Sequence, residues 1–160
     1  MSKIAWNSFV TGEYFFKQDK LEKCISEYIR NLPGASLDDE ALQGDSGIIL
    51  RNIEAQHGLL VARAKNIYSF SHITFQEYFT ARETIIVRQS AEEALQELVS
   101  HLFDKRWLEV FLLAVSMSSN AERLVLLMKT KIDNLLADHQ ELQKYLQWLN
   151  TKTTAANIKY

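Results

Sequence analysis

Apolar residues recur every three or four positions along most of this 160-residue chain, which is the spacing of one face of an α-helix. The pattern is interrupted at one place, where two short β-type runs, 59–64 and 67–71, are separated by Lys65 and Asn66. A β-hairpin is the natural interpretation of such a pair. One Pro and five Gly leave few breaks elsewhere. The sequence therefore predicts a mainly α protein with one β-hairpin.

Four helices are predicted around the hairpin, at residues 4–10, 19–32, 45–56 and 73–88. Asp19, with Glu22 three residues later, is the capping-box pattern that starts a helix, and Gly58 is expected to stop the third helix. Residues 33–45 are acidic and turn-rich, which indicates a linker. Three helices followed by a hairpin are the pattern of a winged helix, with the hairpin as the wing. We therefore assign residues 1–88 to a winged-helix domain.

Residues 89–160 carry only helical patterns and predict a helical bundle or arm. Ser90, with Glu93 three residues later, is a second capping box, and Asn120 is expected to cap a later helix. The stretch 106–117 is apolar almost all round, which indicates a buried helix. Because the helical pattern is already under way at the N-terminus and still running at the C-terminus, we expect a piece of a longer protein.

Aromatic residues are most simply interpreted as core. Around the hairpin these are Tyr68, Phe70, Phe75, Tyr78 and Phe79. In the arm, packing between helices is expected for Trp107, Phe111 and Trp148.

Charge and composition argue against several classes of protein. The formal net charge is −2, so there is no basic excess for binding a phosphate backbone. Cys24 is the only cysteine, which rules out an intrachain disulfide. No apolar run approaches the ~18 residues of a membrane span, and the first residues lack the apolar stretch of a signal peptide. We expect a cytoplasmic protein without a membrane partner.

Motifs for catalysis are also missing. The phosphate-binding pattern GxxxxGK[ST] does not occur, so we expect no ATP hydrolysis by this chain alone. No two of the four histidines have the i, i+4 spacing of a helix-borne zinc site, and we expect no metal. His72 and Glu77 are five residues apart, a poor spacing for one helix face. Glu77 is expected to be a buried or half-buried helix carboxylate tied to the backbone or to an arginine.

A winged helix often places its third helix in the major groove of DNA. Here the predicted third helix, 45–56, offers Arg51 alone among cations, and the wing adds Arg63 and Lys65. These three cations are few for a surface that binds the phosphates of a DNA backbone. A nucleic-acid-binding domain is therefore kept as an alternative, beside a helical protein-interaction scaffold.

The stretch "FSHITFQEYFTAR", residues 70–82, resembles a segment at the end of the winged-helix domain of NACHT proteins. These are signal-transduction ATPases that include the NOD-like receptors. Residues 4–9, 58–64 and 106–114 are also similar to the bacterial NACHT pattern. The resemblance is to the region just after the nucleotidase core, whose Walker motifs are absent. The matching positions are Phe70, His72, Thr74, Phe75, Gln76, Glu77, Tyr78, Phe79 and Ala81.

The resemblance implies a role for His72, which in the family reaches from the winged helix to the β-phosphate of bound ADP and holds the ATPase closed. It implies an upstream nucleotidase core as partner, with ADP or ATP and Mg as cofactors of the parent protein. Exchange of ADP for ATP would release the winged helix and permit homo-oligomerisation, in a process such as bacterial defence. The alternative for His72 is a helix-capping or packing histidine.

Overall fold

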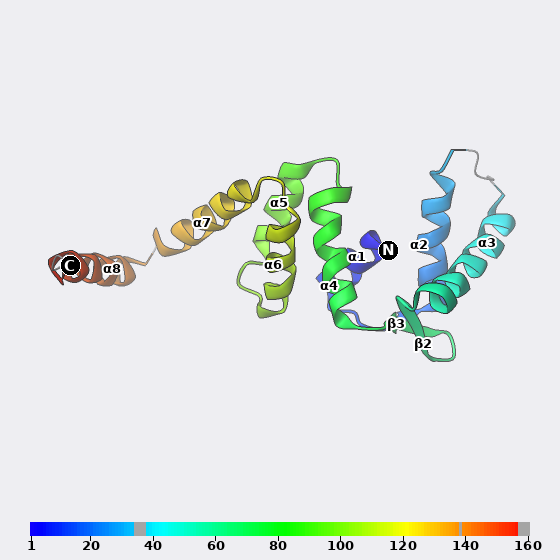
Figure 1. Cartoon of the computed structure of the whole chain (residues 1–160). Helices are drawn as coiled ribbons and strands as arrows, with labels where there is room; N and C mark the ends of the chain where they lie inside the picture. The colour runs from blue at the N-terminus through cyan, green and yellow to red at the C-terminus, as the bar shows by residue number, and fades with distance from the viewer. Residues whose placement is uncertain (34–37, 138, 157–160) are drawn as a thin grey trace.

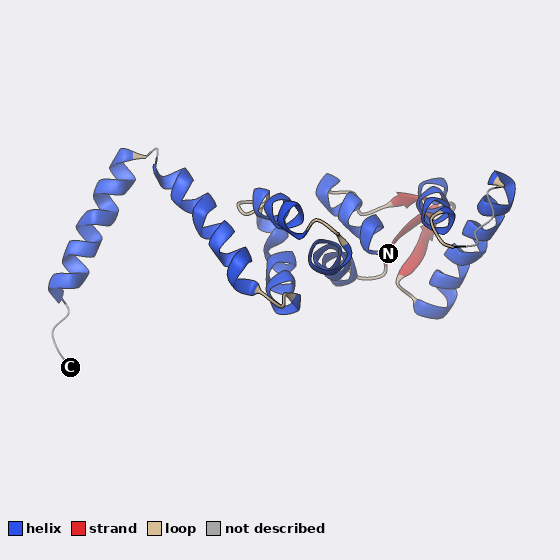
Figure 2. Cartoon of the chain, turned by 90° about the horizontal axis from the view of Figure 1, so that it is seen from above, coloured by secondary structure: helices blue, strands red, loops and turns tan. Residues whose placement is uncertain are grey.

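The computed structural model of the protein describes residues 1–33, 38–137 and 139–156, and it is an elongated molecule (Figure 1). At one end, helices α2 and α3 pack on a small sheet. Helices α1, α4, α5 and α6 form the middle, and α7 and α8 lead away from it to the other end (Figure 2). The fold is mainly α with one β-hairpin, as predicted.

The helices and strands follow each other in this order: α1 Ser2–Thr11, β1 Phe16–Lys17, α2 Gln18–Arg30, α3 Asp39–Asn52, π-helical turn η1 Ile53–His57, β2 Leu60–Ala64, β3 Ile67–Phe70, α4 Ile73–Arg82, π-helical turn η2 Glu83–Val87, α5 Ala91–Ser100, 3-10 turn η3 Lys105–Trp107, α6 Leu108–Met117, α7 Ala121–Ala137 and α8 Gln140–Ala156.

The predicted hairpin is confirmed, and a third strand joins it. Strands β2 and β3 pair antiparallel, and Asn66 in the turn between them has a φ of 60°. Asn is one of the few residues with a side chain that tolerates this left-handed conformation. Strand β1 pairs with the other edge of β3, with Phe16 opposite Tyr68. A strand of two residues carries no alternation that a sequence could reveal.

The start of α3 was predicted wrongly. The helix begins at Asp39, not Asp45, so residues 39–45 are helical and not a linker; residues 34–37 of the predicted linker lie outside the described residues. The acidic composition of this stretch and its Gly44 suggested a linker, but Gly44 lies inside the helix. Gly47, further along α3, marks a close approach to α2, since a Cβ there would lie 3.3 Å from Glu22 Oε1.

The capping predictions have mixed outcomes. Asp19 does not cap α2, which begins one residue earlier with Lys17 as N-cap. Ser90 is the N-cap of α5, but its side chain makes no capping hydrogen bond. Asn120 does cap α7, since its Oδ1 accepts from the backbone N–H of Arg123 at 3.4 Å. Gly58 ends η1 in a left-handed conformation, as expected.

Two clusters of buried side chains form the core; α1 contributes to both, and α4 contributes to the second and packs partly buried side chains on the first. The first cluster joins the sheet to α2 and α3 and includes Ala5, Phe16 and Phe70. The second joins α1 and α4 to the helices that follow and is centred on Trp107. The predicted division at residue 88 therefore stays a prediction, because the two cores are connected through shared helices.

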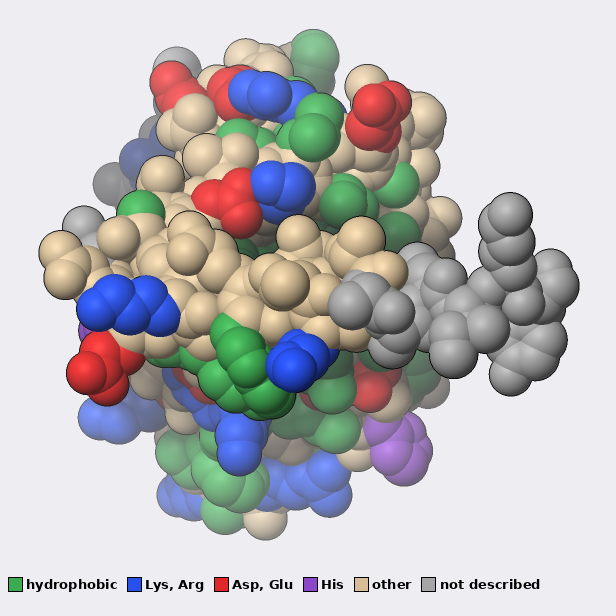
Figure 3. Space-filling model, turned by 90° about the vertical axis from the view of Figure 1, so that its left-hand side faces the viewer, with side chains coloured by type: hydrophobic (Ala, Val, Ile, Leu, Met, Phe, Trp, Pro, Cys, Tyr) green, Lys and Arg blue, Asp and Glu red, His purple; other side chains and the backbone are tan. Residues whose placement is uncertain are grey.

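The arm is less buried than predicted. On α6, Leu108 and Leu112 are 61% and 57% exposed, so this helix is not buried on all sides. None of the described α8 side chains is buried, and Trp148 is 53% exposed instead of packed between helices. Figure 3, which views the molecule from the α8 end, shows hydrophobic side chains open to solvent between charged ones. Within the described residues, no further helix covers these apolar faces.

Candidate functional site

The candidate site is the joint between β3 and α4, where the backbone is held on both sides of His72. Before it, the N–H of Ser71 donates to the carbonyl of Leu59 at 3.0 Å. After it, the carbonyl of His72 accepts from the N–H of Phe75 at 3.1 Å. His72 itself is extended, with φ −133° and ψ 146°, and is the N-cap residue of α4. Its backbone is therefore fixed while its side chain makes no capping hydrogen bond.

The His72 side chain is exposed. Its ring lies 6.2 Å from the ring of Phe75, tilted by 59°. Of the two phenylalanines assigned to the core on either side of it, Phe70 is buried and Phe75 is only partly buried. The aromatic neighbours limit the directions in which the imidazole can point, and its outer side faces solvent.

Arg63 of β2 is a site residue that the sequence did not reveal. Its Nε donates to Ser69 Oγ at 2.8 Å, and its Nη2 donates to the carbonyl of Ser71 at 3.2 Å. These bonds brace the end of β3 and place a guanidinium beside the residue that precedes His72. A cross-strand tie depends on register, which the sequence leaves open until the hairpin is built.

The arrangement can bind an anion. The first N–H groups of a helix lack intrahelical partners and carry the positive end of the helix dipole, and α4 begins directly after His72. An imidazole N–H donates well to a phosphate oxygen, and such charge-assisted bonds are stronger than neutral ones. His72 and the start of α4 therefore offer donors to an anion, and the guanidinium of Arg63 lies beside the carbonyl of the residue before His72.

The remaining motif residues mostly hold the helix in place. Gln76 is buried, and its Nε2 donates to Ser8 Oγ at 2.9 Å and to the carbonyl of Glu13 at 3.1 Å. Ala81 is buried where α4 packs in the second core cluster. Tyr78 is 41% exposed, which contradicts its assignment to the core. The motif thus combines anchoring residues with one exposed histidine.

Glu77 is buried but has no cationic partner among the described residues, contrary to the expected tie to an arginine or the backbone. Burial raises the pKa of its carboxyl group above the ordinary value, and the charge of Glu109 on α6 raises it further. No hydrogen bond or ion pair joins Glu77 to His72 in the described part of the chain. The two residues do not form a catalytic pair in this structure.

The other histidines give no metal site. His101 stacks on Trp107, with ring centroids 4.0 Å apart and planes within 3°, and burial lowers its pKa. Among the described residues, no three His, Cys, Asp or Glu side chains are grouped as metal ligands would be.

No helix in the described part of the chain is long and apolar enough to cross a bilayer.

The fold over α2, α3 and the three-stranded sheet, followed by α4, is that of a winged helix. Comparison with protein families agrees, since residues 17–84 match the family described as winged helix-turn-helix domain C-terminal to NACHT. Residues 17–84 are therefore a winged-helix region of the type that the family description places C-terminal to NACHT. Comparisons with curated proteins and with solved structures gave no match.

Proposed function

We propose that this chain is the regulatory module of a NACHT-type ATPase, and that its winged helix pins the ADP-bound, closed state. The chain itself is not the enzyme, because it lacks the phosphate-binding loop. ADP, or ATP with Mg, would bind to the linked NACHT core. The cores of several copies would be free to assemble after the winged helix is released.

The observation that carries the proposal is the exposed His72 on a fixed backbone at the start of α4. A sensor of bound phosphate needs a donor that is held in direction but is not already used within its own domain. His72 meets both conditions, since no hydrogen bond from its side chain occurs among the described residues. Arg63 adds positive potential from β2 without leaving its own contacts.

The proposed switch depends on a difference in nucleotide contacts between two states of the winged helix, docked and released. A docked winged helix is favoured only as far as the bound nucleotide interacts better with the docked state than with the released one. The hydrogen bond from His72 to a phosphate oxygen is such an interaction. Its loss on nucleotide exchange would bias the equilibrium toward release, and the arm, α5 to α8, would move with the winged helix.

The surface of α3 does not favour the nucleic-acid alternative. A reading helix needs cations on its exposed face to neutralise phosphates. In α3 the only cation is Arg51, and the helix also carries several acidic residues, among them Glu40 and Asp45. This surface supports docking to protein more than docking to DNA.

The proposal can be tested by binding in two parts. The NACHT core of the same protein is produced separately, and its affinity for this chain is measured by calorimetry with and without ADP. We expect ADP to strengthen binding of the wild-type chain and to have little effect on His72→Ala. The matched control is His57→Ala, which removes another exposed histidine near the hairpin and should behave as wild type. Binding that is equally strong without ADP, or an unaltered His72→Ala, would refute the pinning role.

A further inference from the structure

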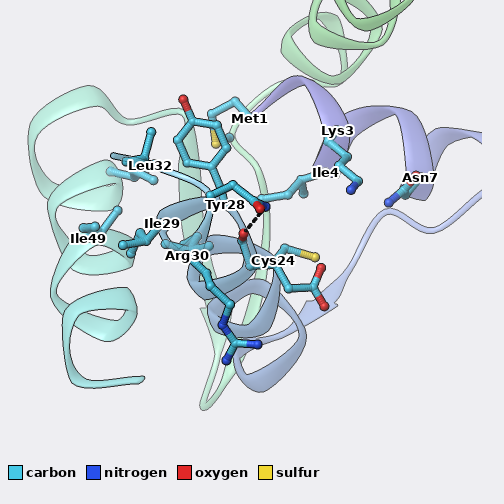
Figure 4. A pocket seen from close by; sticks show the side chains of 14 residues that line it. Met1, Lys3, Ile4, Asn7, Cys24, Tyr28, Ile29, Arg30, Leu32 and Ile49 are labelled. Atoms are coloured by element: carbon cyan, nitrogen blue, oxygen red, sulfur yellow. Dashed lines mark hydrogen bonds between the residues drawn. The ribbon is translucent and has the colours of Figure 1, made fainter. Parts of the chain in front are cut away.

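A groove of about 610 Å³ lies between α1, α2 and α3, away from the candidate site (Figure 4). Met1 and Ile4 line it at the start of α1, Cys24 and Tyr28 line it along α2, and Ile49 lines it from α3. Its position is toward the C-terminal end of α2, whereas the sheet and the β3–α4 joint lie at the N-terminal end of that helix (Figure 1). A single partner that contacts both places would hold the winged helix at two separated points.

The groove exists because the apolar stripe of α2 is wider than the surface that the fold covers. Leu21 and Ile25 are buried in the first core cluster. Cys24 and Tyr28, the next line of the stripe, point into the groove instead. Tyr28 is 69% exposed, and Leu32, one turn further along, is 45% exposed. Contiguous apolar surface of this kind marks an interaction site more often than a plain surface.

The place of the groove in the chain indicates what covers it. In the matched family the NACHT domain lies N-terminal to the winged helix, so the chain that leads from that domain to residues 17–84 passes through α1. Met1 and Ile4 are among those residues, and both line the groove. A tethered domain has a high effective concentration for a surface beside its point of attachment. The linked core is therefore the partner best placed to fill this groove.

The charge around the groove agrees with a protein partner. The residues that line the groove include the cations Lys3 and Arg30 and the anion Glu27. The charge of the rim is therefore mixed, unlike that of a phosphate-binding surface. An apolar centre with a polar rim is the usual anatomy of a protein–protein interface.

From these observations we infer that the groove between α1, α2 and α3 receives apolar side chains of the linked NACHT core, as a second docking contact that is separate from His72. The inference rests on the proposed function for the identity of the partner. It differs in its chemistry, because an apolar contact does not require bound ADP.

Cys24 provides the test, because it is the only cysteine of the chain and lines the groove half-buried. The rate of Cys24 alkylation by N-ethylmaleimide is followed by intact-mass spectrometry, alone and with a cysteine-free NACHT core of the same protein. With the core at about ten times its Kd, the alkylation rate should fall about tenfold, since only the unbound fraction reacts. Protection should be lost at the same core concentration for Tyr28→Glu, which places a charge in the apolar groove.

The matched control is Phe103→Glu, which changes another exposed aromatic residue that does not line the groove and should keep full protection. Circular dichroism melts of both variants check that each is folded. Core binding that is ADP-dependent and lost in His72→Ala, while Cys24 stays reactive, would leave the proposed function standing and overturn this inference. Protection that rises with the concentration of this chain alone would assign the groove to a second copy and overturn it too. Absence of any core binding would overturn both proposals.

Discussion

At the scale of single residues, His72 is unusual in combining a fixed backbone with an exposed side chain. None of the hydrogen bonds that hold the backbone on either side of it uses the imidazole, so the imidazole is not needed to join β3 to α4. A residue with this arrangement is expected to matter for binding and not for folding.

The first prediction follows directly. His72→Ala should change the free energy of unfolding of this chain by no more than about 0.5 kcal/mol, as for other solvent-facing side chains. Urea denaturation of wild type and variant measures the difference. Phe70→Ala is the contrasting variant, because Phe70 is buried against Phe16 and should lose about 3–5 kcal/mol. A loss of that size in His72→Ala would identify the residue as a structural joint.

Glu77 gives a prediction of pH dependence. Its pKa is raised in the folded protein by burial and by the charge of Glu109. At a pH between the ordinary pKa and the raised one, the folded state therefore holds a proton that the unfolded state has released. The stabilising contribution of this proton is complete below the ordinary pKa of a glutamate and is lost as the pH rises through the raised pKa. Glu77→Gln should therefore melt at a higher temperature than wild type at neutral pH, and the gap should close in acid.

The control for Glu77→Gln is Glu93→Gln, which makes the same change of charge at an exposed position of α5. Its melting temperature should follow that of wild type across the pH range. If Glu77→Gln were less stable than wild type at neutral pH, the carboxylate would have a partner that stabilises its charged form.

At the scale of elements, hydrophobic periodicity predicted the helices and strands that depend on local sequence. It missed those that depend on contacts with distant parts of the chain. The hairpin and α4 were predicted because their apolar spacing and turn residues are local. Strand β1 was missed because its two residues are ordered only by pairing with β3. The start of α3 was misplaced because residues 39–45, which are acidic and include Gly44, have a turn-like composition although they are helical. Arg63 was missed as a site residue because its hydrogen bonds cross the hairpin.

The turn that leads into α6 carries the third prediction. Trp107 is fully buried and makes edge contacts with Trp6 and Phe9, while His101 stacks on its face. Trp107→Ala should cost about 3–5 kcal/mol through lost burial and the cavity that remains. Denaturant midpoints measure it, with Trp148→Ala as the matched exposed tryptophan that should cost little. Equal effects of the two variants would show that α6 is not held to α1 by this side chain.

At the scale of the whole molecule, α1 and α4 connect the winged helix to the helices that follow. Buried side chains of α1 lie in both core clusters, and α4 adds buried Ala81 to the second cluster and partly buried Phe75 and Phe79 to the first. Gln76 of α4 donates to Ser8 of α1 and to the carbonyl of Glu13, just after α1. If the winged helix is displaced as proposed, we expect these contacts to move α5 and α6 with it. Helix α8, with no buried side chain among its described residues, extends beyond this connected body.

The fourth prediction tests whether α8 lies outside the cooperatively folded part of the chain. A chain shortened to residues 1–137 should unfold with the same midpoint as the full chain, within about 0.5 kcal/mol, because elements with few buried apolar contacts contribute little to global stability. Far-ultraviolet circular dichroism should fall only by the signal of the helix removed. A clearly lower midpoint for the shortened chain would mean that α8 is part of the cooperative core.

The most direct test of the account is the ADP affinity of the NACHT-containing protein with and without the His72 side chain. Loss of one charge-assisted hydrogen bond, about 1.5–3 kcal/mol, predicts that His72→Ala weakens ADP binding by about ten- to a hundredfold. Affinity for ATP should change little, because the docked state that His72 supports is the ADP-bound one. His57→Ala should bind ADP as wild type does. Equal ADP affinities of wild type and His72→Ala would contradict the account.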